Sequence, residues 1–157
     1  MRLVCLLALL SVASPMPRVR STNPVIAAAL EEAQARSVTF RNLVRTIEGT
    51  DGIVYVEKGQ CRRGVRACLS LSVVSGGGYR LLRVLVDGVD DAVELMATIG
   101  HELRHANELL SEPSVTTMAA AYSYYAREAA TAREVFETPA AIKAGIAVAN
   151  DLARSRR

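Results

Sequence analysis

Apolar residues recur at helical spacing in the first third of the chain. This spacing predicts two helices, over residues 24–36 and 38–48. Asn23 and Ser37 stand directly before them and belong to the residue types that cap helix N-termini. In the second helix, the residues expected on the buried face are Phe40, Leu43, Val44 and Ile47.

The period then changes to the alternation that is typical of strands. We expect strands at residues 53–56, 67–74 and 79–86, which are rich in apolar and β-branched residues and are separated by glycine-containing connections. Short connections between successive strands favour an antiparallel arrangement with one face on the core. This region therefore predicts a small three-stranded antiparallel sheet.

The rest of the chain is predicted to be helical, in three helices over about residues 91–110, 114–135 and 139–154, because Pro113 and Pro139 interrupt the pattern. A short sheet with several helices predicts an α+β fold. A length of 157 residues suits one domain, which we place at residues 23–157. The first of these helices should pack against the sheet through Met96, Ile99, Leu103, Ala106 and Leu110.

The N-terminus has the features of an export signal. Arg2 precedes an apolar run over residues 3–12, and small residues follow, so cleavage is expected near Ala13. The run is shorter than the roughly 20 apolar residues that cross a bilayer. We therefore expect an exported protein, periplasmic or secreted, without a membrane span in its mature chain, and a flexible lead-in over residues 14–22.

Two cysteines remain after the predicted cleavage site, Cys61 and Cys68. Export places them in an oxidising compartment, which favours a disulfide. The polar, glycine-containing segment between them would let two antiparallel strands bring the cysteines within bridging range. A pair of free thiols and a metal-binding pair are the alternatives.

The charge of the chain argues against a nucleic-acid partner. The formal net charge is +3, and the one dense basic stretch is the terminal segment 154–157. Such a segment is typical of a solvated chain end.

Both histidines of the chain lie in the helix predicted over residues 91–110, and they carry its most specific chemical signal. His101 and His105 are four residues apart, so they share one helix face and their imidazoles can reach one metal ion. Glu102 lies about 100° further round the helix, where it can act as general base on a metal-bound water. The alternatives are two exposed histidines without a role and a buried pair satisfied without metal.

Residues 98–105 resemble the active-site helix of the zincin metallopeptidases, which carry a His-Glu-x-x-His motif. The three strands before this helix and the helices after it resemble the minimal catalytic half of these enzymes. The resemblance implies a zinc-dependent peptidase that acts on a peptide or protein. The chain departs from the usual pattern at Arg104 and Asn107, where uncharged and apolar residues are common. The mature chain also resembles small exported bacterial proteins.

A third zinc ligand has to be a carboxylate, since the chain contains two histidines in all. In zincins of the glutamate type a later helix supplies it, and the run from Glu137 to Ala140 resembles their Glu-x-x-Ala sequence. Glu137 is therefore the expected ligand, and Glu134 and Glu128 are the alternatives. Without metal, Glu137 would simply favour the N-terminus of the last helix through the helix dipole.

Glu108 and three tyrosines are candidates for supporting roles at this site. Glu108 is one turn beyond His105 and is expected to orient that histidine, the alternative being a solvated surface carboxylate. A tyrosine hydroxyl could stabilise an oxyanion in a peptidase, although packing is the simpler role for an aromatic ring. The candidate donors are Tyr122, Tyr124 and Tyr125.

Two functions follow from the sequence. The first is a zinc peptidase in which an extended substrate pairs with a strand edge, for which residues 79–86 are the nearest candidate. The second is a metal-binding or partner-binding envelope protein that does not hydrolyse anything. The sequence leaves the substrate and the oligomeric state open.

Overall fold

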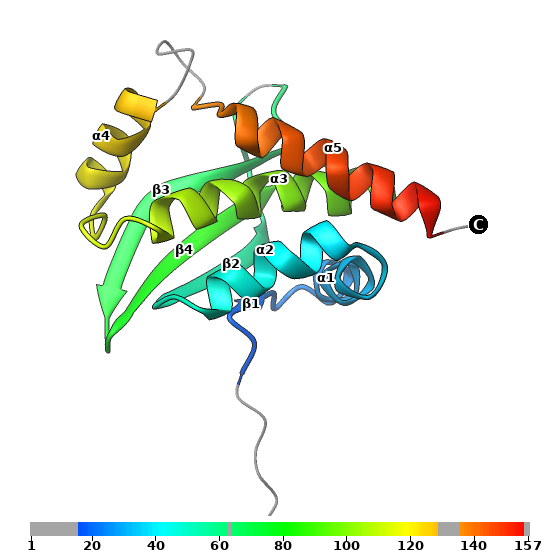
Figure 1. Cartoon of the computed structure of the whole chain (residues 1–157), viewed down its shortest axis with the longest axis horizontal. Coiled ribbons are helices and arrows are strands. Elements are labelled where there is room, and N and C mark those ends of the chain that lie inside the picture. Colours follow the sequence, from blue (N-terminus) through cyan, green and yellow to red (C-terminus); the bar gives the residue numbers. More distant parts are fainter. Residues whose placement is uncertain (1–15, 63, 129–135, 156–157) are drawn as a thin grey trace, which may run out of the picture.

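The computed structural model of the chain describes residues 16–62, 64–128 and 136–155. Within them the protein is an α+β fold of five helices and one four-stranded sheet (Figure 1). The elements in chain order are β1 (Val19–Arg20), α1 (Pro24–Arg36), α2 (Val38–Glu48), β2 (Gly52–Lys58), β3 (Ala67–Gly76), β4 (Tyr79–Val86), α3 (Ala92–Leu110), α4 (Met118–Glu128) and α5 (Pro139–Arg154).

The sheet is mixed, with the strand order β1-β2-β4-β3. β3 and β4 form the expected antiparallel hairpin, and its tight turn contains Gly77 and Gly78 at φ values of 60° and 80°, a conformation that favours glycine. β4 also pairs in parallel with β2, and β2 pairs in parallel with β1. The predicted three-stranded antiparallel sheet is therefore wrong in its topology, because β2 pairs with the second strand of the hairpin.

β4 is an inner strand of the sheet. Its inward residues Leu82 and Val84 are fully buried, and both of its edges are paired. The expectation that residues 79–86 offer a free edge to a peptide is therefore wrong. β3 is an edge strand of the sheet and contacts α3. Its pairing with β4 is interrupted by an irregularity between Ser70 and Val74.

Two residues of the predicted lead-in, Val19 and Arg20, form β1, and Val19 is buried beside β2. The predicted export signal falls in residues 1–15, which lie outside the described residues. None of the helices in the described part of the chain has the length and apolar character needed to cross a membrane.

α3 is the helix around which the others pack. It contacts β2, β3 and β4 on one side and α1, α2 and α5 on the other, and Figure 1 shows it running along the sheet with α5 beside it. The predicted core stripe is confirmed, since all five of its members are buried: Met96, Ile99, Leu103, Ala106 and Leu110. The sheet and the helices therefore share one core.

α3 and α5 approach closely because glycine faces the partner helix on each of them. A Cβ atom at Gly100 would lie 2.8 Å from Val148 Cγ2, and one at Gly145 would lie 3.2 Å from His101 Cβ. Larger residues would push the helices apart. The two glycines thus allow α5 to lie directly over the part of α3 that carries the histidines.

Arg80 fastens the C-terminal end of α3 to the sheet. Its side chain is buried and forms a 2.7 Å ion pair with Asp51. It also donates to four main-chain carbonyl oxygens at the end of α3 and just beyond, those of Leu109, Leu110, Glu112 and Val115. Leu109 O also accepts from Glu112 N, and Glu112 O from Val115 N, so Arg80 adds to the main-chain hydrogen bonds at the end of α3 and joins this end to the sheet.

Candidate metal centre

His101, His105 and Glu137 converge on one point between α3 and α5. One potential ligand atom from each residue lies within 4.8 Å of the other two, so this group could hold a metal ion. The two imidazoles come from successive turns of α3, and Glu137 comes from the residues that lead into α5. His101 Nε2 lies 3.2 Å from Glu137 Oε2. We call this group the His-His-Glu cluster.

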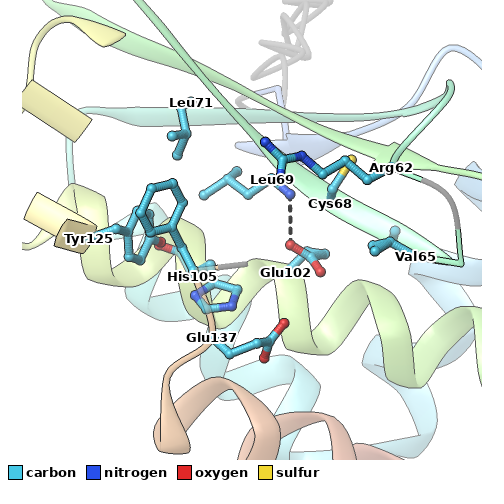
Figure 2. A pocket seen from close by; sticks show the side chains of 11 residues that line it. Arg62, Val65, Cys68, Leu69, Leu71, Glu102, His105, Tyr125 and Glu137 are labelled. Atoms are coloured by element: carbon cyan, nitrogen blue, oxygen red, sulfur yellow. Dashed lines mark hydrogen bonds between the residues drawn. The ribbon is translucent and has the colours of Figure 1, made fainter. Parts of the chain in front are cut away.

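Of the three glutamates considered as third ligand, Glu137 lies in this cluster. Glu134 is outside the described residues, and so is the side chain of Glu128, although its main chain ends α4. Figure 2 shows the carboxylate of Glu137 and the ring of His105 pointing toward the same space as Glu102.

The partial burial of His101 favours its neutral form. Its side chain is 19% exposed. Burial lowers the pKa of His101 and the nearby His105 adds to this effect, while the carboxylate of Glu137 opposes it. A neutral imidazole is the form that binds a metal ion.

Glu102 stands beside the cluster in a more buried position, with only 5% of the residue exposed. Burial raises the pKa of Glu102 to about 7, although His105 and the hydrogen bond from the Leu69 main chain oppose the rise. Its Oε2 accepts that bond from Leu69 N at 2.7 Å, and its Oε1 lies 3.9 Å from His101 Nε2. A carboxyl group with a pKa near 7 can both take up and release a proton at neutral pH.

Glu108 connects His105 with the start of α5. Its Oε2 lies 3.0 Å from His105 Nδ1, and its Oε1 accepts a 2.7 Å hydrogen bond from Thr138 Oγ1. Burial by itself would raise the pKa of Glu108, but the hydrogen bonds with His105 and Thr138 outweigh it and lower the pKa. Glu108 is thus a buried carboxylate in contact with the ring nitrogen that a metal bound at Nε2 would leave available.

Arg104 and Asn107, the two departures from the zincin pattern, have separate surroundings. Asn107 is buried and donates to Leu43 O at 3.1 Å, so it ties α3 to α2. Arg104 is partly exposed, and its Nε lies 3.4 Å from Glu108 Oε1. Neither residue belongs to the His-His-Glu cluster.

Among the candidate oxyanion donors, Tyr125 contacts the motif directly. It is buried, its ring centroid lies 5.5 Å from that of His105, and its hydroxyl donates to His105 O at 2.9 Å. That hydroxyl is therefore engaged with the main chain of α3. Tyr124 packs against Tyr125, and the largely exposed Tyr122 packs against Phe136.

The predicted disulfide between Cys61 and Cys68 is confirmed, with a Cα–Cα distance of 6.0 Å. It closes the loop that leads into β3. Cys68 and the neighbouring Leu69 line a cavity above Glu102 (Figure 2). The disulfide thus fixes the strand whose main chain contacts Glu102.

Two contacts of the site do not follow from the sequence pattern. The hydrogen bond from Leu69 to Glu102 depends on the packing of β3 against α3, for which the sequence carries no local signal. Thr138 does carry one, because a threonine directly before a proline is typical of a helix N-terminus. Its contact with Glu108 was not foreseen.

Fold and site together define an α+β protein with a buried His-Glu-x-x-His helix and a His-His-Glu group that could hold a metal ion. Comparisons of the chain with models of protein families, with curated proteins and with solved structures give no match.

Proposed function

We propose that the protein is a zinc-dependent metallopeptidase of the zincin type. The observation that carries the proposal is the convergence of His101, His105 and Glu137, with the buried Glu102 beside them. The disulfide agrees with action in an oxidising compartment, which the predicted export signal would provide.

The choice of zinc comes from the chemistry of the donors. Two imidazoles and one carboxylate are a ligand set found in catalytic zinc sites, where the fourth position is left to water or substrate. The neutral form favoured at His101 and the contact of Glu108 with His105 Nδ1 both suit imidazole ligands that bind through Nε2. The residues present therefore fit a zinc ion.

Zinc bound there would act as a Lewis acid that polarises a peptide carbonyl and lowers the pKa of a water. Glu102 is the group that would take the proton from this water, since it is buried beside the cluster with its Oε1 3.9 Å from His101 Nε2. The same carboxyl would then pass the proton to the departing amine. Glu108 and Thr138 would hold His105 and the start of α5 in place.

A second function is a metal-binding envelope protein without hydrolytic activity. The observation in its favour is the 2.7 Å hydrogen bond between Glu102 and Leu69 N, which holds the proposed base against β3. For catalysis this carboxylate must face the water as well as the strand. Both functions require the metal, so a measurement of peptide cleavage, and not of metal binding, distinguishes them.

The proposal is tested by cleavage of peptide substrates by zinc-loaded protein and its Glu102→Gln variant. We expect the wild type to cleave peptides, and the variant to keep its zinc but lose at least about 100-fold in kcat, the lower range for removal of a general base. Equal activity of the two proteins would refute the role of Glu102. Zinc binding without any cleavage by the wild type would favour the second function.

A further inference from the structure

A cavity of about 260 Å³ lies on the side of the His-His-Glu cluster that is nearer the C-terminal end of α3. Figure 2 shows it between β3, α3 and the residues that lead into α5. Its walls are largely apolar and include an aromatic pair in stacked contact, Tyr125 and Phe136. Since an apolar cavity of about 150 Å³ accommodates benzene, this one has room for a large side chain. The rest of its wall is formed by the apolar residues Val65, Ala67, Leu69 and Leu71, by the disulfide-bonded Cys68 and by Arg62.

A second cavity, of about 390 Å³, lies toward the N-terminal end of α3. His101 and Ala97 form its floor, and α5 contributes Ile142, Gly145 and Ile146 to its wall. The two isoleucines are 47% and 59% exposed, so they offer apolar surface that the fold itself leaves uncovered. This cavity therefore suits an aliphatic group that lies across the surface.

The two cavities meet at the proposed catalytic residues. Ala67, Glu102 and Glu137 line both of them, whereas His105 lines the first and His101 the second. A molecule that reaches both cavities must therefore pass directly over Glu102 and Glu137. A single amino-acid side chain cannot occupy both, but an extended polypeptide can.

The outer edge of β3 offers main-chain groups to such a polypeptide. The N–H group of Leu69 points away from β4 and is taken by Glu102, so the group that Leu69 offers at this edge is its carbonyl oxygen, which points to the same side in an antiparallel strand. Main-chain groups two residues apart in a strand point the same way, so Ala67 also faces this edge. Both residues line the first cavity, and an extended peptide can pair with a strand edge of this kind.

From these features we infer that the site takes an internal segment of an extended polypeptide, with a large apolar side chain in the first cavity and an aliphatic side chain against Ile142 and Ile146. The inference rests on the proposed function and deepens it. Because the clefts continue on both sides of the cluster, the free ends of the polypeptide lie outside the site. The protein would thus cleave within chains, at apolar sequences that are exposed when a substrate is extended or unfolded.

The test uses peptides that are acetylated at one end and amidated at the other, with phenylalanine, alanine or lysine at the position expected in the first cavity. Zinc-loaded wild-type protein should cleave the capped phenylalanine peptide. Replacing phenylalanine by alanine or lysine should lower kcat/KM at least about tenfold, since pocket contacts of this size discriminate by that much. A requirement for a free terminus, or equal rates for phenylalanine and lysine, would overturn the inference.

Ile146→Lys tests the second cavity from the protein side. Its matched control is Val25→Lys, which alters an exposed residue on α1 that lines neither cavity. We expect Ile146→Lys to raise KM for peptides with an aliphatic residue at the facing position, with normal zinc content, whereas Val25→Lys should leave KM unchanged. Equal KM values in the two variants would show that α5 does not contact the substrate.

Binding to the zinc-loaded Glu102→Gln variant separates this inference from the proposed hydrolysis. If that variant binds the capped phenylalanine peptide at least tenfold more tightly than the lysine peptide, while wild-type protein cleaves neither, the polypeptide site stands and the peptidase activity fails. Cleavage by the wild type without any preference in binding or rate would support the activity and refute the site described here.

Discussion

Glu102 and Glu137 have different surroundings at the site, and these surroundings match different tasks. The side chain of Glu137 is 37% exposed and lies 3.2 Å from His101, as suits a ligand that can face an open metal position. Glu102 is buried, with its pKa raised to about 7. The sequence indicated both roles through the motif and the Glu-x-x-Ala resemblance, but the pKa depends on burial by distant parts of the chain.

Gly145 offers a test of how closely α5 controls the position of His101 in the His-His-Glu cluster. A methyl group at this position would meet His101 Cβ at 3.2 Å, tighter than ordinary contact. We therefore expect Gly145→Ala to shift His101 and to weaken zinc binding by about tenfold, comparable to the loss of a supporting contact. The readout is the zinc dissociation constant, measured by competition with a chelating dye.

Gly49→Ala is the matched control for Gly145→Ala. Gly49 ends α2, its φ of −78° suits any residue, and an added Cβ would meet Thr46 O at an ordinary 3.5 Å. This variant should bind zinc as the wild type does. Wild-type affinity in Gly145→Ala would contradict the close coupling of α5 and His101.

At the scale of elements, the start of α5 is tied to the motif through Thr138. Its hydroxyl oxygen accepts from Ala141 N at 3.2 Å, which caps α5, and donates to Glu108, which contacts His105. We expect Thr138→Val to weaken zinc binding about tenfold and to lower the free energy of unfolding by about 1–2 kcal/mol. Zinc competition and urea unfolding measure the two effects.

Two controls separate positioning from stability in the Thr138 experiment. Thr138→Ser keeps the hydroxyl and should restore both properties. Asn23→Ala removes the cap of α1, which lies away from the site. The Asn23 side chain accepts hydrogen bonds from Val25 N and Ile26 N. It should cost about 1 kcal/mol without any effect on zinc affinity. A loss of affinity in Asn23→Ala equal to that in Thr138→Val would indicate a purely structural effect.

The C-terminal half of α5 is tied to α2 through Asp151, and this contact makes stability depend on pH. Burial alone would raise the pKa of Asp151, but hydrogen bonds from Thr39 N and Ser37 Oγ outweigh it and lower the pKa from 3.8 to about 2. Because the pKa of Asp151 is lower in the folded than in the unfolded chain, its ionised carboxylate stabilises the fold above pH 3.8. This stabilisation is lost as the pH falls through about 2.

We expect Asp151→Asn to destabilise the protein by about 1 kcal/mol at neutral pH. The difference from the wild type should shrink between about pH 4 and pH 2, where the wild-type carboxylate becomes protonated. Urea unfolding of both proteins across this range measures it. A difference that is constant with pH would show that the charge of Asp151 does not stabilise the fold.

The element boundaries show what local sequence can and cannot predict. Asn23, Ser37 and Asp91 cap their helices, since their side chains accept hydrogen bonds from main-chain N–H groups of the first turn. These helix starts could therefore be predicted from the sequence. The hairpin of β3 and β4 could be predicted from the glycines of its turn. The parallel pairing of β2 with β4 could not be predicted in this way, because it depends on contacts between segments far apart in the chain.

In the whole molecule, the fold brings together the three residues of the His-His-Glu cluster from α3 and from the start of α5. His101 and His105 are fixed by one helix, which a four-residue spacing is enough to predict. Glu137 reaches them because Gly100 and Gly145 let α5 lie against α3, while Arg80 holds the other end of α3 to the sheet. These packing relations are properties of the folded chain as a whole.

Zinc binding by the His-His-Glu cluster is the property on which the proposed function depends. The most direct measurement is the zinc content of the purified protein after zinc loading and removal of excess metal, determined by elemental analysis beside the His101→Ala variant. We expect one zinc ion per wild-type chain and a large loss of zinc in the variant. A folded wild-type protein that retains no zinc, or a His101→Ala variant that retains as much as the wild type, would contradict it.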